Sequence, residues 1–312
     1  MITVASYLKG IPPNNRNPEK PALLRNFITG VNALGDRGFV VDNNKILGVD
    51  VAVIQGWVHA DSKNVPHLNL RKLIYEHQIR NHKRCIIVDS NLFLYSDPSN
   101  SKGYLRYSYD GVFPDTGEYC WDNPDPLRWQ QIFKDLNLKL RPWHYAGGGN
   151  ILICAQRDGG WSMNGQDTFA WTIETINKIK AHTDRQIVVR FHPGDRETKN
   201  NQKRLVKLGL KHVSVSNNID FRQDIKNAWA LVNYNSSPAV AAVIEGVPAF
   251  VLDRDKSQAK DVAHNNLAEL ESPTYFDREQ WIRKVAMSHW NHNELKCGAC
   301  WSHMRKWALV RK

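Results

Sequence analysis

Short apolar runs alternate along most of the chain with longer segments in which apolar residues recur at helical spacing. The first pattern is typical of buried strands and the second of amphipathic helices. In the first half, the pattern predicts strands at 2–5, 38–41, 51–54 and 84–88 and helices at 20–34 and 68–81. In the middle, it predicts strands at 150–155, 186–191, 213–216, 230–234 and 249–252 and helices at 167–180, 201–208, 221–229 and 238–245.

Strands that are separated by helices predict βαβ units, which build a parallel sheet covered by helices on both faces. Because the alternation occurs twice, we expect an α/β protein of two Rossmann-like domains, residues 1–145 and 146–275, that face a cleft. Residues 276–312 follow as two helices, predicted at 278–290 and 293–310. Residues 96–126 are rich in Gly, Pro, Asp, Asn and Tyr, which predicts a long functional loop.

The composition excludes some classes of protein and favours a polyanionic partner. Of the 312 residues, 42% are hydrophobic, which excludes a disordered or fibrous chain. Lys and Arg number 42 against 31 Asp and Glu, and the resulting net charge is +11. Such a charge favours nucleic acid, an anionic membrane surface or an acidic sugar as the partner. A basic enzyme without such a partner is the alternative.

Compartment and metal content are predicted from what the chain lacks. No apolar run approaches the roughly 18 residues of a membrane span, and the first residues lack the layout of a signal peptide. The five cysteines are an odd number, so we expect reduced thiols in a cytoplasmic protein that has no membrane partner. Cys297 and Cys300 lie near His292 and His303, but no second pair stands at zinc spacing, so no metal site is predicted.

The first candidate for chemistry is the turn after the strand predicted at 186–191. Arg190 is the second-to-last residue of the strand, and His192 directly follows the strand. Pro193 blocks further strand pairing and stiffens the turn. A histidine and an arginine at a strand end can both contact phosphate oxygens. A turn with a structural histidine is the alternative.

The second candidate is the sequence Asn235-Ser236-Ser237 between a predicted strand and a helix that begins with Pro238. One serine before the proline is ordinary helix capping. Capping does not account for Asn235, Ser236 and Ser237 together, and two hydroxyls beside free backbone N–H groups can also bind an anion.

The third candidate is a glycine-rich turn that includes Gly148 and Gly149, directly before a strand. It is neither a Walker loop nor a dinucleotide fingerprint, because no Gly-Lys-Ser/Thr follows and the glycines precede the strand. Backbone approach to a ligand or hinging is predicted instead. Gln156 and Arg157 follow that strand in a polar loop at the expected cleft edge. Lys9, Gly10 and Gly30 are candidates for the acceptor side.

Together these motifs resemble the nucleotide-sugar half of GT-B glycosyltransferases. A strand ending in His192-Pro193, then a strand ending in Ser236-Ser237 before a helix closed by Glu245, is similar to Kdo, polysialic acid and polyglycerol-phosphate transferases. The resemblance implies that the histidine and both serines hold the donor phosphate or diphosphate, and that Glu245 lies near the nucleotide. It also implies that the C-terminal helices, residues 276–312, cross back to the first domain.

Residues 104–119, 123–129 and 290–303 resemble glycosyltransferases of tailed phages. This resemblance implies that the acceptor is a hydroxylated cytosine in double-stranded phage DNA and that the protein acts in the infected host cell. An extruded base needs aromatic side chains to stack on. The segment offers Tyr104, Tyr107, Tyr109, Phe113, Tyr119 and Trp121. A packed, tyrosine-rich loop is the alternative.

Transfer of the sugar requires a base that removes the proton of the acceptor hydroxyl. Asp89, at the end of a predicted strand, ranks first, before Asp115 and Asp110 in the aromatic segment. Each can instead be a turn or cap residue. The departing diphosphate can be stabilised by His192, Arg190, Arg157 and Ser236, so a divalent metal is compatible with the site but not required.

The sequence therefore predicts a monomeric glycosyltransferase with residues 1–145 binding the DNA acceptor and residues 146–275 binding a nucleotide sugar, UDP-sugar first. No other cofactor is predicted. A transferase that builds a surface glycan is the first alternative, because an acidic acceptor also suits the charge. A non-catalytic DNA-binding protein that retains the GT-B fold is the second.

Overall fold

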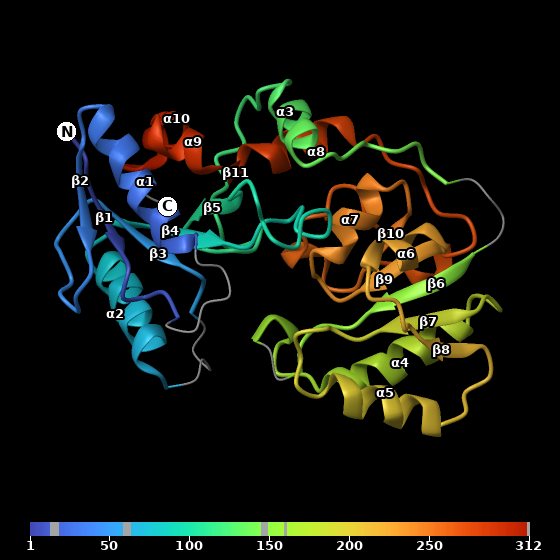
Figure 1. The fold of residues 1–312 in the computed structure, drawn as a ribbon. Coiled ribbons are helices and arrows are strands. Elements are labelled where there is room, and N and C mark those ends of the chain that lie inside the picture. Colours follow the sequence, from blue (N-terminus) through green and yellow to red (C-terminus); the bar gives the residue numbers. More distant parts are fainter. Residues whose placement is uncertain (13–18, 59–63, 145–148, 159–160, 311–312) are drawn as a thin grey trace. The chain divides into compact units, whose positions relative to one another are not determined.

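The computed structural model describes residues 1–12, 19–58, 64–144, 149–158 and 161–310, and it consists of two α/β units (Figure 1). The first unit comprises Met1–Leu136 together with Ile282–Lys312, and the second comprises Asn137–Trp281. These divisions, at 136/137 and 281/282, differ from the predicted ones at 145/146 and 275/276. The return of the last residues to the first unit agrees with the predicted fold class.

The sheet of the first unit has the strand order β11-β5-β4-β3-β1-β2. Strands β1 to β4 are parallel, whereas β5 is antiparallel to β4 and β11 is antiparallel to β5. The strands are β1 Thr3–Tyr7, β2 Arg37–Val41, β3 Val51–Gln55, β4 Arg84–Asp89, β5 Leu105–Tyr109 and β11 His289–Trp290. The helices are α1 Lys20–Ala33, α2 Pro66–Arg80, α3 Arg128–Asp135, α8 Glu279–Met287, α9 His292–Lys296 and α10 Ala299–Met304.

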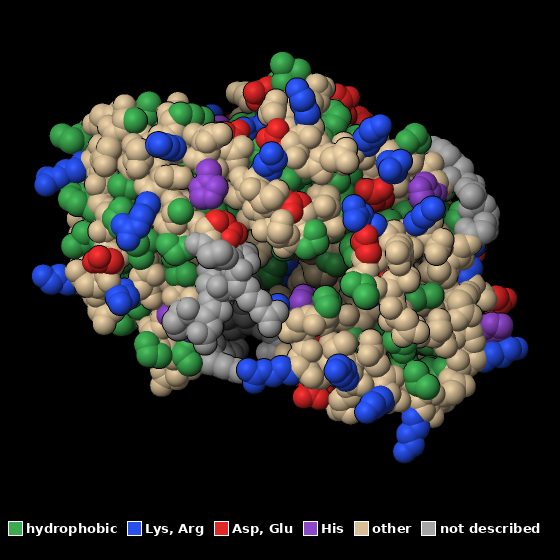
Figure 2. Space-filling model, viewed as in Figure 1, with side chains coloured by type: hydrophobic (Ala, Val, Ile, Leu, Met, Phe, Trp, Pro, Cys, Tyr) green, Lys and Arg blue, Asp and Glu red, His purple; other side chains and the backbone are tan. Residues whose placement is uncertain are grey.

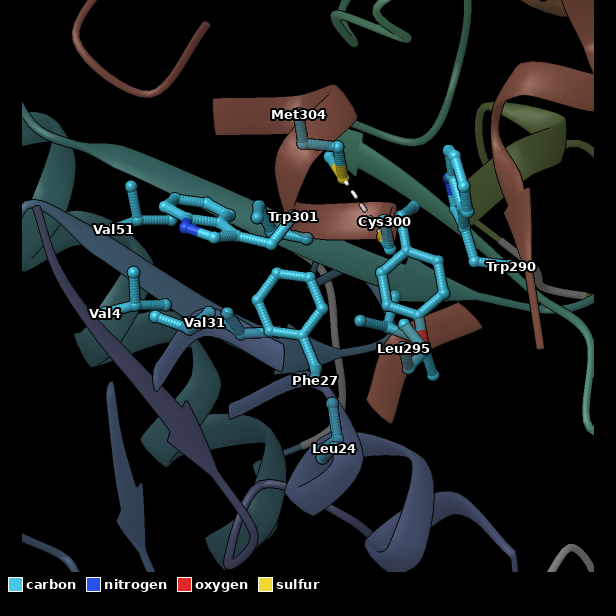
Figure 3. Packing of buried hydrophobic residues seen from close by; sticks show 14 of the residues in the cluster. Val4, Leu24, Phe27, Val31, Val51, Trp290, Leu295, Cys300, Trp301 and Met304 are labelled. Atoms are coloured by element: carbon cyan, nitrogen blue, oxygen red, sulfur yellow. Dashed lines mark hydrogen bonds between the residues drawn. The ribbon is translucent and has the colours of Figure 1, made fainter. Parts of the chain in front are cut away.

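Aromatic side chains of α1 and α10 fill the core beside the first sheet. Phe27 of α1 meets Trp301 of α10 edge to face, with ring centroids 5.9 Å apart, and stacks on Tyr107 of β5 (Figure 3). Val4, Val51 and Leu24 close the same cluster. The core of this unit is therefore built from residues at both ends of the sequence.

The prediction of a long functional loop at 96–126 is wrong in part, because β5 lies within it. Tyr104, Tyr107, Tyr109 and Tyr119 are at most 3% exposed and belong to the core. Trp121 is half-buried and stacks on Tyr119 at 4.8 Å. The buried rings are not free to stack on an extruded base, so the packing alternative is correct for them.

The C-terminal segment returns to the first unit through a close backbone contact. A Cβ atom on Gly30 of α1 would lie 2.1 Å from the carbonyl oxygen of Leu295 and 2.8 Å from Cα of Gly298. Gly30 thus serves packing and not the acceptor side. Gly298 has a φ of +85° and separates α9 from α10, so the single helix predicted at 293–310 does not form.

A buried carboxylate reinforces this contact. Asp36, which is 5% exposed, accepts hydrogen bonds from the indole Nε1 of Trp301 at 2.9 Å and from the backbone N–H of Ile2 at 2.8 Å. The Arg305 guanidinium also donates to it, at 2.5 and 3.1 Å, and holds the pKa of Asp36 well below its usual range. The carboxylate joins the first strand to the last helix.

The second unit is a parallel sheet with the order β10-β9-β6-β7-β8, shown in green to orange in Figure 1. The strands are β6 Asn150–Cys154, β7 Ile187–Arg190, β8 Val213–Val215, β9 Ala228–Asn233 and β10 Ala249–Val251. The helices are α4 Thr168–Lys180, α5 Thr198–Lys207, α6 Phe221–Lys226 and α7 Pro238–Ile244. Helix α6 is shorter than predicted because the fully buried β9 begins two residues earlier than expected.

The described ranges contain neither a membrane-spanning helix nor a cluster of metal-binding side chains. None of the helices there is both long and apolar enough to cross a membrane. The same ranges hold no group of three or more His, Cys, Asp or Glu side chains that suits a metal ion. Cys297 is exposed and Cys300 is buried against Met304.

Replacing Gly30 with alanine should destabilise the first unit, because the added methyl group must displace the backbone of Leu295. We expect a loss of about 3 kcal/mol in the free energy of unfolding. Denaturant unfolding measures it. Gly48→Ala is the matched control, since nothing lies within 4 Å of a Cβ atom at Gly48, and its effect should stay within about 0.5 kcal/mol. Equal stability of the two variants would contradict the close contact.

Candidate functional site

The topology of the second sheet points to one edge as its ligand site. From the central strand β6 the chain continues through β7 and β8 on one side and then through β9 and β10 on the other. Connections that follow β6 and β9 therefore run in opposite directions, and in open α/β sheets ligands bind at the carboxyl ends of the strands at such a point. Residues that follow β6, β7 and β9 are the candidates for binding there.

The side chains of an arginine and a histidine lie close together at this edge. Arg157 follows β6, and His192 follows the neighbouring strand β7. The Nε of Arg157 lies 3.5 Å from Nδ1 of His192. A Cβ atom on Gly194 would lie 2.9 Å from Nη2 of Arg157, so the glycine leaves room for the guanidinium beside the histidine. Arg157 is exposed and can reach a ligand.

The environment of His192 fixes which of its nitrogens can donate. Nδ1 accepts a hydrogen bond from the backbone N–H of Gly194 at 3.0 Å, which favours the tautomer with the proton on Nε2. Burial, and then the nearby Arg157 charge, lowers the pKa of His192 below its ordinary value of 6.5. At neutral pH the ring is therefore a neutral Nε2–H donor.

Ser236 and Ser237 follow β9 at the same edge. The side chain of Asn233 donates to the Ser236 carbonyl oxygen at 2.8 Å and to its Oγ at 3.1 Å, which fixes the turn. Ser237 is the N-cap residue of α7, but its hydroxyl makes no capping hydrogen bond and its side chain is exposed. Ordinary capping thus does not account for Ser237.

Gln156 and Asn235, both predicted to contact the donor, hold the turns together instead. The backbone N–H of Asn235 donates to Oε1 of Gln156 at 3.0 Å, and its side chain donates to the Ser162 carbonyl oxygen at 2.9 Å. Both residues are less than 10% exposed. They connect the end of β6 to the end of β9 and position Arg157 and Ser236.

Two aspartates that the sequence analysis missed also build this edge. The backbone N–H of Asp158 donates to Asp195 at 2.8 Å, and the Asp158 carboxylate accepts from the N–H of Thr168, at the start of α4, at 2.9 Å. These bonds join the loop after β6 to the His192 turn. The only sequence signal was the position of each aspartate within three residues of Arg157 or His192.

The prediction that Arg190 contacts the donor is not supported by its geometry. Its guanidinium donates to the Asp224 carboxylate at 2.7 Å and to the carbonyl oxygens of Asn218 and Ile219 at 2.7 and 3.0 Å. Asp224 is 5% exposed. Arg190 therefore ties β7 to α6 and the loop before it.

Glu245 and Gly149 lie at the opposite edge of this sheet. Glu245 is the C-cap residue of α7, eight residues after Ser237, and forms an ion pair with Arg141 at 2.9 Å. Gly149 precedes β6, and a Cβ atom there would lie 2.8 Å from the backbone nitrogen of Trp229. Gly149 thus permits close strand packing. Neither residue joins the His192 cluster, and Gly148 lies outside the described residues. Pro193 is exposed within the His192 turn.

The three candidate carboxylates of the first unit also separate. Asp89 ends β4 at the carboxyl edge, is ion-paired with Arg106 at 2.5 Å, and its side chain is 29% exposed. Asp110 pairs with Arg84 at the start of β4 and accepts from the Cys85 N–H, so it is structural. Asp115 is exposed in the turn between Tyr109 and Glu118, at the same far edge. Strand length separates the two edges by roughly 15 Å, which leaves Asp89 as the candidate base.

Comparison with known proteins supports the fold. No family model matches the chain, and no curated protein matches it. Among solved structures, the β-Kdo 2,4-transferase KpsC of Thermosulfurimonas dismutans matches with a TM-score of 0.51 and 12% identity, covering 92% of this chain and 90% of that one.

Two further structures match less well. The β-Kdo 2,7-transferase KpsC of the same organism has a TM-score of 0.49 at 11% identity and covers 96% of this chain and 98% of its own. AviGT4, a glycosyltransferase of avilamycin A biosynthesis, has a TM-score of 0.33 at 10% identity with full coverage of both chains. At these identities the 2,4-transferase match establishes the fold alone, and it confirms the predicted GT-B class of two Rossmann-like units.

Arg157 and Arg190 should respond differently to loss of charge. Arg157→Gln should weaken binding of UDP-glucose about tenfold without changing the thermal midpoint. Arg190→Gln leaves the buried Asp224 unpaired and should cost about 3 kcal/mol of stability. Calorimetric titration and thermal unfolding measure the two effects. A loss of stability in the Arg157 variant would reverse the assignment.

The pKa of His192 predicts how donor binding depends on pH. A bound diphosphate favours the charged imidazolium, so binding raises the lowered pKa and takes up a proton. Affinity should rise as the pH falls through the raised pKa of His192 in the complex and should level off below its lowered pKa in the free protein. UDP-glucose suits the titration because its pyrophosphate does not titrate in that range. His192→Gln should remove the dependence, and an unchanged pH profile would separate His192 from the donor.

Proposed function

We propose that the protein is a glycosyltransferase that transfers a sugar from a nucleotide sugar, UDP-sugar first, to an acceptor hydroxyl. The observation that carries the proposal is the convergence of Arg157, His192, Ser236 and Ser237 at the carboxyl ends of three adjacent strands. These side chains offer one positive charge and several hydrogen-bond donors, as a diphosphate requires. The support from the Kdo transferase is its shared fold.

The cluster can stabilise the leaving group without a metal. As the glycosidic bond breaks, negative charge grows on the departing diphosphate. Arg157 supplies a compensating charge, His192 donates from Nε2, and the hydroxyl of Ser237 adds a donor. The network of Gln156 and Asn235 holds these groups in place before the substrate binds, which lowers the reorganisation that catalysis needs.

We further propose that Asp89 of the first unit removes the proton of the acceptor hydroxyl. Its Oδ2 accepts from Nη2 of Arg106, while among the described residues no hydrogen bond to Oδ1 is present. Arg106 is 6% exposed and fixes the orientation of the carboxylate. One oxygen is thus held and the other can accept the hydroxyl proton.

For the acceptor we retain a hydroxylated cytosine in double-stranded DNA, with an acidic surface glycan as the alternative. The first unit supports a polyanionic acceptor, because it contains 23 Lys and Arg against 15 Asp and Glu, a net charge of +8. On the face in Figure 2, Lys and Arg are dispersed over the surface. The buried tyrosines remove stacking as an argument for DNA.

Mass spectrometry of digested nucleosides tests the function. The protein is incubated with duplex DNA that contains 5-hydroxymethylcytosine and with UDP-, CDP- and GDP-sugars. A hexose or pentose mass on the modified cytosine is the expected result. Hydrolysis of the donor without a glycosylated DNA product would favour a glycan as the acceptor. DNA binding without any donor binding would favour the non-catalytic alternative and contradict the proposal.

Variants separate the donor site from the base. Ser237→Ala and His192→Ala should weaken donor binding about tenfold and leave DNA binding unchanged. Asp89→Asn should lower turnover by at least 100-fold, within the range of general base catalysis, with both substrates still bound. Asp115→Asn is the matched control, because it removes an exposed carboxylate from the far edge of the same sheet. Wild-type turnover by the Asp89 variant would eliminate it as the base.

A further inference from the structure

The strand order of the first sheet also reverses, at its strand β1. The chain passes from the central strand β1 to β2 on one side and then to β3, β4 and β5 on the other. The loops that follow β1 and β3 therefore diverge at the carboxyl edge. Gly10 follows β1, Gln55 and Gly56 end β3, and Asp89 ends β4 beside them.

A buried arginine that no sequence pattern indicated lies at this carboxyl edge. Arg71 of α2 is 4% exposed. Its Nε donates to the carbonyl oxygen of Gly10, and its Nη2 donates to Oε1 of Gln55 at 3.3 Å. A Cβ atom added to Gly10 would lie 3.2 Å from Cγ of Arg71, and one added to Gly56 would lie 2.8 Å from Nη1 of Arg71. The two glycines thus leave the space that the side chain occupies.

The charge of Arg71 is not matched by a bonded carboxylate among the residues that the structure describes. Its hydrogen-bond partners there are a carbonyl and an amide oxygen. Asp89 attracts it electrostatically, but the Asp89 carboxylate is already paired with Arg106. Burial of a cation without a paired anion is costly, so this position favours an anion that supplies the missing charge.

Two more basic groups lie near enough to Arg71 to feel its charge. Lys20, at the start of α1, feels the charges of Asp89 and Arg71, and burial lowers its pKa. His67 lies one turn before Arg71 on α2, and burial together with the Arg71 charge lowers its pKa. Burial also lowers the pKa of Arg71 to about 10. Arg71 and Lys20 both interact with the charge of Asp89, whereas His67, whose pKa is lowered below 6.5, is neutral at pH 7 and adds no charge.

We propose that Arg71, assisted by Lys20, binds a backbone phosphate of the nucleic-acid acceptor next to Asp89. This inference rests on the proposed function and names a site on the acceptor side of it. A guanidinium fixed by two neutral acceptors presents its remaining N–H groups in a set direction, which suits a phosphate oxygen. The net charge of +8 on this unit favours a polyanionic strand. The phosphate contact positions the acceptor nucleotide, and Asp89 takes the hydroxyl proton.

The test is the binding of a short duplex with one 5-hydroxymethylcytosine, measured by fluorescence anisotropy at several salt concentrations. Arg71→Gln should weaken binding by roughly tenfold or more and lower the salt slope by about one. Arg71→Lys, which keeps the charge but loses the fixed geometry, should lie between. Arg80→Gln is the matched control, because it removes one exposed charge from the far end of α2. Affinity of the Arg71 variants equal to that of Arg80→Gln would overturn the proposal.

Neutral methylphosphonate linkages identify the contact. Replacing the phosphate that Arg71 binds should weaken DNA binding by the wild-type protein as much as Arg71→Gln does. Binding of the modified DNA by the Arg71→Gln variant should be no weaker than either change alone makes it. Fully additive losses at every linkage near the modified base would overturn the proposal. So would Arg71-dependent binding of a glucuronate oligosaccharide by a protein that binds no DNA, since the anion would then be a glycan carboxylate.

Donor binding and sugar transfer are measured in the same variants, with thermal midpoints to show that each folds. If Arg71→Gln does not fold, Arg71→Lys and the methylphosphonate series carry the test. Arg71-dependent DNA binding without transfer from any donor would refute the proposed function and leave the phosphate site standing. Transfer that Arg71→Gln does not impair would refute the phosphate site and leave the proposed function standing.

Discussion

The common direction of the parallel strands is the constraint on which both candidate sites depend. Parallel strands all end at one edge of their sheet. The residues after β6, β7 and β9 therefore lie at the same edge, although they are far apart in the sequence. The same holds for β1, β3 and β4. Asp110 and Glu245 carry suitable side chains, but they lie at the opposite edges and their carboxylates pair with arginines of the fold.

The two edges hold their positive charge in different ways. Arg157 is exposed, so water screens its charge and a ligand can leave it at a small cost. Arg71 is buried, where the lower dielectric strengthens its field and where its direction is fixed by Gly10 and Gln55. An exposed cation suits a diphosphate that must depart after each turnover. A buried and oriented cation suits selection of the acceptor.

Sequence periodicity predicted the strands of the second sheet because each is a short run rich in apolar residues between helices, and β6, β9 and β10 are almost fully buried. It missed β5, whose alternating tyrosines stand between Gly- and Asp-rich turns and look like part of a loop. His192 and Ser236 were predicted because strand ends can be recognised locally. The pairing of Arg190 with Asp224 joins residues 34 positions apart, and no local pattern indicates it. Arg71 was missed because burial of a helical arginine depends on which strand the helix covers.

Burial of the tyrosines changes what must select the acceptor. Had Tyr104, Tyr107 and Tyr109 been exposed, stacking would have favoured a planar base whatever its charge. Since they stabilise the core against α1 and α10, recognition at the carboxyl edge of the first sheet falls, in the proposed function, to the charged side chains of Arg71 and Asp89. Such groups distinguish ligands by the sign and position of charge. In the proposed function, selection by this unit therefore rests on where the acceptor carries its anionic group relative to the hydroxyl that reacts, a geometry that we assign to Arg71 and Asp89.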